Sequence, residues 1–205
     1  MIHFLSLGVV LGLSAGFAPG PLLTLVVAET LRHGIKSGLK VALAPVLTDV
    51  PIVTVCFLLL AKLSSFRVIM GGLSLAGATF IFVLGMQAVL GKEGGQHKKS
   101  EATTSLAKGV LVNFLSPHPY LFWLTVGGPL VSRAISVDRA APFAFVGGFY
   151  LLLIGSKMFL AAVVSRSRGF LQGGWYHMIL RFLGGVLIFL SILLFKEGIA
   201  MLGSG

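Results

Sequence analysis

Two proline-rich breaks interrupt long apolar segments about half a chain apart, at residues 18–21 (Ala-Pro-Gly-Pro) and 116–119 (Ser-Pro-His-Pro). Proline lacks a backbone N–H and clashes with the preceding helical turn, so a helix is expected to break or kink at each site. Inside a bilayer, unpaired backbone groups are tolerated only where protein buries them or a watery cavity solvates them. Paired interruptions in two halves of a chain are typical of the binding site of a secondary transporter.

The composition places these breaks in a membrane. The chain has 205 residues, of which 56% are hydrophobic and 11% charged, and its mean hydropathy is +1.00. Soluble domains carry roughly 25% charged residues, and a membrane span needs about 20 apolar residues. We therefore predict an all-α integral membrane protein with six transmembrane helices. The predicted spans are 2–31 (broken at 19–21), 40–61, 68–90, 105–132 (broken at 117–119), 142–164 and 179–202.

A polar linker at residues 91–104 divides the chain into two halves, residues 1–90 and 105–205. Each half begins with a broken helix and continues with two further apolar spans. Because the number of spans per half is odd, the second half must insert upside down relative to the first. This pattern predicts two inverted three-helix repeats, an arrangement common among secondary transporters. A chance pair of kinks is the alternative, since proline is frequent in membrane helices.

The net charge of +10 is spread between the apolar runs, so it indicates membrane topology and not a nucleic-acid partner. The basic residues predicted inside are Arg32, Lys36, Lys40, Lys92, Lys98, Lys99, Lys108, Arg166, Arg168 and Arg181. Those predicted outside are Lys62, Arg67, Arg133, Arg139 and Lys196. Because lysine and arginine concentrate on the cytoplasmic side, we expect a cytoplasmic linker, both termini outside and a location in the cell membrane.

The sequence lacks the residues that several kinds of activity require. The single cysteine, Cys56, excludes a dithiol redox centre within one chain. The sequence contains no phosphate-binding loop, no His-Glu-x-x-His pair and no Gly-x-Ser-x-Gly elbow. We therefore expect no enzyme activity, no catalytic or metal-ligating residues and no cofactor, with an ion gradient, preferably of protons, as the energy source.

Two charged residues lie deep in predicted spans. Asp49 is the only charged residue between positions 41 and 57. A carboxylate at that depth is costly and usually faces a cavity or a partner. It could bind a substrate ammonium group, exchange a proton or form hydrogen bonds with backbone groups that a helix break leaves unpaired. Lys157 could pair with Asp49, attract a substrate carboxylate or extend its amine to the interface.

The breaks supply further candidates. After the first break, the N–H groups of residues 22–24 carry the positive end of a helix dipole, which suits a carboxylate. At the second, Asn113 and Ser116 either satisfy stranded backbone groups or contact substrate. His118 either caps the helix or titrates near neutral pH and couples transport to protons. The candidate substrate-binding or coupling residues are Pro19, Gly20, Pro21, Asp49, Asn113, Pro117, His118, Pro119 and Lys157.

Other polar, aromatic and glycine residues receive structural interpretations. Glu29 precedes Arg32 by three and His33 by four positions, so we expect a local helical ion pair. That leaves Asp49 as the only buried acid expected, which argues against a metal-cation cargo, because hard cations want several oxygen ligands. The Phe122-Trp123 pair is interpreted as packing or an interfacial belt. The four-residue spacing of Gly8, Gly12 and Gly16 favours close helix packing.

These motifs resemble those of a known family, the LysE/RhtB amino-acid exporters. The motif Gly-Phe-Ala-Pro-Gly-Pro at residues 16–21 is similar to the family's opening motif, and His33-Gly34-x-x-x-Gly38 to the loop that follows it. Asp49 matches the acid of the second span. The segment 113–123, with Pro129, resembles the Asn-Pro signature of the second half.

The resemblance implies efflux of amino acids or close derivatives across the cytoplasmic membrane, driven by an ion gradient. The expected partners are a small-molecule substrate, the lipid bilayer and a second copy of the chain as a homodimer. Two alternatives stay open: a metal-cation exporter of the same superfamily and a non-transporting membrane scaffold. The scaffold would need neither Asp49 nor Lys157 at depth.

Overall fold

The computed structural model describes residues 1–59, 63–90, 101–167 and 174–203, and these residues form helices and no β-strand. The predicted linker 91–104 lies mostly outside the described residues, and its last residues, from Glu101, already belong to a helix. The elements are α1 Ile2–Phe17, α2 Pro21–His33, α3 Ile35–Ala42, α4 Ala44–Leu59, α5 Leu63–Val89, α6 Glu101–Phe114, α7 Pro117–Phe122, the π-helix η1 Trp123–Gly127, α8 Gly128–Val137, α9 Ala141–Ser167 and α10 Gly174–Gly203.

Within the described ranges, five segments are long and apolar enough to cross a membrane, or up to six if the bent pair α1 and α2 counts as one span. This confirms an all-α protein with several membrane-length segments, and the exact number of six spans stays a prediction. The inverted symmetry of the two halves stays a prediction. The five segments are Ile35–Thr54, Gly71–Val89, Pro117–Val137, Ala141–Ser167 and Met178–Gly203.

The first proline break lies where the sequence predicts it. Helix α1 ends at Phe17, Gly20 is extended with φ −167°, and Pro21 is the first residue of α2. The two helices meet at a bend of 62°. Proline suits the first helical position because its missing N–H would have no intrahelical partner there.

The second break is displaced from the predicted position, 117–119. Helix α6 ends at Phe114 and α7 begins at Pro117, so the chain leaves the helix at residues 115–116. Ser116 has φ −86° and ψ 133°, because the residue before proline avoids the helical region. The membrane-length segment at this break is therefore Pro117–Val137, where the sequence predicted 105–132. The segment predicted at 40–61 likewise begins earlier, at Ile35, because α3 continues almost directly into α4.

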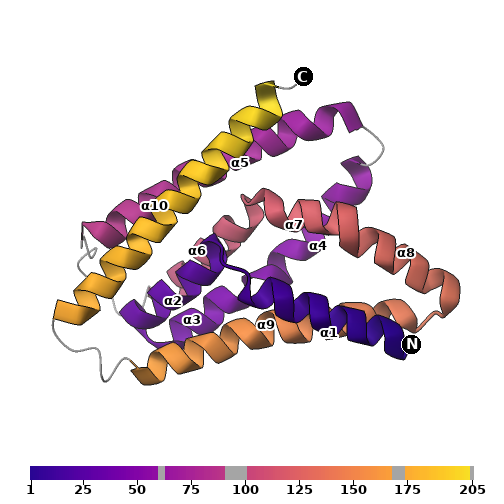
Figure 1. Cartoon of the computed structure of the whole chain (residues 1–205), viewed down its shortest axis with the longest axis horizontal. Helices are drawn as coiled ribbons and strands as arrows, with labels where there is room; N and C mark the ends of the chain where they lie inside the picture. Colours follow the sequence, from indigo (N-terminus) through magenta and orange to yellow (C-terminus); the bar gives the residue numbers. More distant parts are fainter. Residues whose placement is uncertain (60–62, 91–100, 168–173, 204–205) are drawn as a thin grey trace.

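Helices of the two halves pack in pairs across the molecule. Helix α1 lies along α9, and α5 lies along α10 (Figure 1). A Cβ atom at Gly8 or Gly12 would overlap the backbone carbonyl of Phe145 or Phe149 on α9. The glycine spacing in α1 therefore permits close backbone contact, as predicted.

The turn between α2 and α3 depends on two glycines. Gly34 has φ 90° and ψ 176°, a conformation essentially restricted to glycine. Four residues on, a Cβ atom at Gly38 would overlap the hydroxyl of Thr30 on α2. The His-Gly-x-x-x-Gly motif therefore folds α3 back against α2. This places the start of α4, and with it Asp49, beside the two breaks.

Candidate functional site

A cavity of about 420 Å³ lies where the two breaks meet. Segments from both halves line it: the α1–α2 break, α4, the α6–α7 break, η1, α9 and α10. Of the predicted site residues, Pro117 is buried in α7 and is not part of the lining. The predicted residues that do line the cavity are Pro19, Gly20, Pro21, Asp49, Asn113, His118, Pro119 and Lys157.

Asp49 is held by donors from three other elements. Its side chain is buried, with 4% of its surface exposed. The Oδ2 atom accepts hydrogen bonds from Tyr150 Oη at 2.8 Å and Trp123 Nε1 at 3.4 Å, and Oδ1 accepts one from Asn113 Nδ2 at 3.2 Å. All three donors are neutral. No cationic side chain in the described part of the chain forms an ion pair with Asp49, so its carboxyl group is available to a positively charged ligand.

One acceptor position of Asp49 stays available. The Thr48 hydroxyl lies 3.4 Å from Oδ1, but it also lies 3.1 Å from the Ala44 carbonyl. A hydroxyl donates one hydrogen, and the shorter contact to Ala44 uses it. Thr48 Oγ1 in turn accepts a hydrogen bond from Asn113 Nδ2 at 2.6 Å. Since each carboxylate oxygen accepts about two hydrogen bonds, Oδ1 retains one position for a ligand.

The polar residues of the second break make side-chain contacts. From the sequence, two roles were possible for Asn113 and Ser116: hydrogen bonding to freed backbone groups or binding of substrate. The Asn113 amide bonds to Thr48 and Asp49 on α4. The Ser116 hydroxyl contacts Nδ1 of His118 at 3.2 Å. The exposed His118 side chain belongs to the first turn of α7 and lines the cavity, and its part in proton coupling stays a prediction.

Lys157 holds the end of α1. Its amine donates to the carbonyls of Ala15 at 3.2 Å and Gly16 at 2.9 Å, which are among the carbonyls freed by the break. A cation is favourable at a helix C-terminus. With 4% of its surface exposed, the side chain does not extend to the interface, and it does not bond to Asp49. Two of the three ammonium donors are used, so one is left for a ligand.

Helix α2 begins at the cavity wall. The first intrahelical bond runs from the Thr24 N–H to the Gly20 carbonyl at 3.0 Å, so the prediction of an available N–H at Thr24 is wrong. Leu22 and Leu23 line the cavity and precede that bond. Their N–H groups are the donors that the first turn of a helix leaves without intrahelical partners.

Three site residues were missed by the sequence analysis. Trp123 is 6% exposed and packs in the hydrophobic core, which confirms the packing interpretation, and its indole N–H in addition donates to Asp49. Tyr150 could have been found, because a phenol in a long apolar run needs a polar partner. Glu197 on α10 also lines the cavity and was overlooked beside Lys196.

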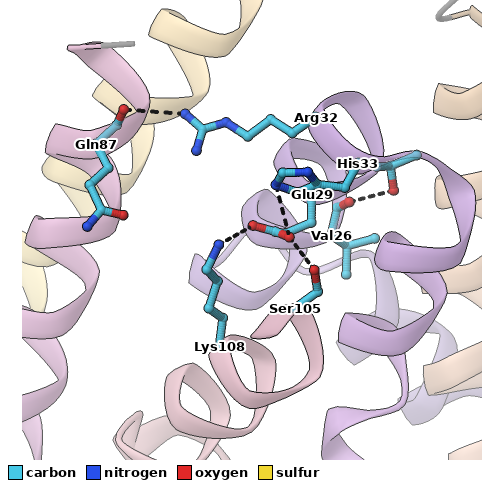
Figure 2. A network of polar contacts seen from close by, with 8 residues as sticks. Val26, Glu29, Arg32, His33, Gln87, Ser105 and Lys108 are labelled. Carbon is cyan, nitrogen blue, oxygen red and sulfur yellow. Dashed lines mark hydrogen bonds and ion pairs between the residues drawn. The ribbon is translucent and has the colours of Figure 1, made fainter. Parts of the chain in front are cut away.

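A second buried acid corrects the expectation that Asp49 is the only one. Glu29 is 2% exposed and binds Lys108 Nζ at 2.8 Å and the Ser105 hydroxyl, both on α6 (Figure 2). The predicted local contact to His33 exists at 3.9 Å. The closer partner of Glu29, however, is Lys108, which lies on a helix of the other half. Among the described residues no three His, Cys, Asp or Glu side chains are grouped to hold a metal ion.

A set of membrane-length helices around a cavity between two helix breaks is typical of a multi-pass membrane transport protein. The comparison with known families agrees with this class. The family model described as LysE type translocator matches residues 13–198, and the chain belongs to this family. No curated protein and no solved structure gave a significant match.

Proposed function

We propose that the protein exports amino acids or closely related small zwitterions across the cell membrane, and that the cavity between the two breaks is the substrate site. The observation that carries the proposal is the carboxylate of Asp49, which has only neutral partners and shares one cavity with Lys157 and the N-terminus of α2. A volume of about 420 Å³ is within the usual range for small-molecule sites.

The site matches both charges of a zwitterion. The substrate ammonium group occupies the remaining acceptor position on Asp49 Oδ1. The substrate carboxylate binds the N–H groups of Leu22 and Leu23 and the third donor of Lys157. Helix N-termini bind anions because their N–H groups and dipole are both favourable. Phe149 and Leu153 add apolar surface for the side chain.

Transport follows from alternating access around this site. The first break belongs to one half of the chain and the second break to the other, so rocking of one half against the other exposes the cavity to each side in turn. An ion gradient, with protons as the favoured ion, supplies the energy. A potential of 100 mV adds about 2.3 kcal/mol per charge moved. Both termini are outside in this proposal.

A substrate screen with an Asp49 variant tests the function. Inverted vesicles are supplied with cationic, neutral and sulfur-containing amino acids and with divalent metals at two pH values. We expect uptake of an amino acid that Asp49→Asn abolishes without loss of folded, inserted protein. Asp138→Asn is the matched control, because that exposed carboxylate caps the α8–α9 turn through the Ala140 N–H at 3.1 Å.

Each result separates the candidate functions. Uptake of a metal in place of amino acids would favour the cation exporter, and no uptake of any solute would favour the scaffold. Normal amino-acid transport by Asp49→Asn would remove Asp49 from the site and contradict the binding mode. Equal losses in Asp49→Asn and Asp138→Asn would show a general effect of removing a carboxylate.

A further inference from the structure

The buried Glu29 cluster has no part in the substrate site. Glu29 on α2 is almost fully buried, and Lys108 and Ser105 on α6 bind its two oxygens (Figure 2). Close by, the Arg32 guanidinium reaches the Gln87 carbonyl on α5 at 3.5 Å. Side chains on α2 therefore contact α5 and α6 at this level of the molecule.

The cluster lies along the same two helices that bound the cavity. Glu29 is roughly 12 Å beyond Pro21 on α2, and Lys108 is about 7.5 Å before Asn113 on α6, at 1.5 Å per residue. Pro21 and Asn113 both line the cavity. The contact therefore ties α2 to α6 between the cavity and the turn at Gly34, where α2 is followed by α3, which carries Lys36 and Lys40.

The Glu29–Lys108 ion pair suits a contact that has to form and break during transport. Apolar residues of similar volume stabilise a static interface as well as a buried ion pair does, because removing two charges from water is costly. An ion pair, in contrast, can be replaced by water and other charges when the helices separate. Alternating access requires helices that line the cavity to separate on one side of it. Helices α2 and α6 come from different halves of the chain, and the Glu29–Lys108 contact is one that holds them together.

We propose that Glu29 and Lys108 form the gate that closes the cavity on the side of the membrane carrying Lys36, the side predicted to be cytoplasmic. The proposal rests on the proposed function, because it takes the cavity as the substrate site. In an exporter this gate has to open for substrate to enter. Ser105 positions Glu29 in the closed state through its hydrogen bond.

Thiol accessibility tests the gate without any substrate. In a Cys56→Ala background, the cavity residue Leu23 is changed to cysteine and labelled with a membrane-impermeant maleimide in vesicles of each orientation. A separate Lys36→Cys protein identifies the gate side. We expect Glu29→Gln and Lys108→Met each to raise the labelling rate from that side at least tenfold and to leave the rate from the opposite side unchanged.

Two further variants keep the result interpretable. The exchanged pair Glu29→Lys with Lys108→Glu should restore slow labelling. If the single variants acted through a general loss of packing, the exchanged pair would still label fast. Lys40→Met removes a cation on the same side of the molecule and should label like the parent. Unchanged labelling in both single variants, or fast labelling in the exchanged pair and in Lys40→Met, would overturn the gate. Because labelling needs no cargo, a failed substrate screen would refute only the proposed function.

Discussion

At the scale of single residues, the environment of Asp49 decides what the site can bind. Its carboxyl group has neutral partners from α6, η1 and α9, while Lys157 uses its amine at the end of α1. The two side chains therefore stay apart, and in the proposed function each attracts one end of a zwitterion. A direct ion pair between them would have neutralised both and weakened the site.

The Tyr150 hydroxyl makes the shortest hydrogen bond to Asp49, at 2.8 Å. Tyr150→Phe removes it, and a hydrogen bond to a charged group contributes about 1.5–3 kcal/mol. We expect transport at subsaturating substrate to fall by about tenfold or more. Tyr120→Phe is the matched control, because its hydroxyl bonds to the Phe114 carbonyl at 3.0 Å and not to Asp49. Equal rates for the two variants in vesicle uptake would contradict the role of Tyr150.

At the scale of elements, proline and glycine determine where the helices begin, end and turn. The first break is readable from the sequence because Pro19 and Pro21 frame Gly20. The second is displaced because Pro117 starts a helix instead of ending one, and only the residue before it becomes extended. The tight α2–α3 turn depends on the positive φ of Gly34.

Gly34→Ala tests that turn. Alanine is strained at φ 90° and ψ 176°, at a cost of about 1–3 kcal/mol. We expect the free energy of unfolding in detergent to decrease by that amount. A Cβ atom at Gly147 on α9 would meet no neighbouring atom. Gly147→Ala should therefore leave the free energy of unfolding unchanged or raise it slightly, because alanine is the better helix former. A decrease for Gly147→Ala and none for Gly34→Ala would show that the turn does not constrain the fold.

At the scale of the whole molecule, helices from the two halves pair across the chain. Helix α1 packs on α9, and the same stretch of α9 supplies Phe149, Tyr150 and Lys157 to the site. The Phe149 ring also stacks on Phe122 at 4.8 Å between ring centres. The packing of α1 therefore positions one wall of the cavity.

Gly12→Ala should disturb both the packing and the site. The added methyl group would overlap the Phe149 carbonyl, so the two helices must separate. Overpacking of this kind costs about 1–3 kcal/mol. We expect a lower free energy of unfolding together with reduced transport. Gly155→Ala on α9 meets open space and should leave both unchanged, and a Gly12→Ala protein with parental stability and transport would contradict the coupling of packing to the site.

The sequence by itself determined the membrane class, the first break, the depth of Asp49 and Lys157 and the family resemblance, because these follow from local hydropathy, proline chemistry and motif spacing. Only the tertiary structure decided which side chains meet. Trp123 and Tyr150 reach Asp49, and Lys108 reaches Glu29, through contacts between segments far apart in the chain. Such contacts depend on how helices pack in three dimensions, which the local pattern of one sequence does not encode.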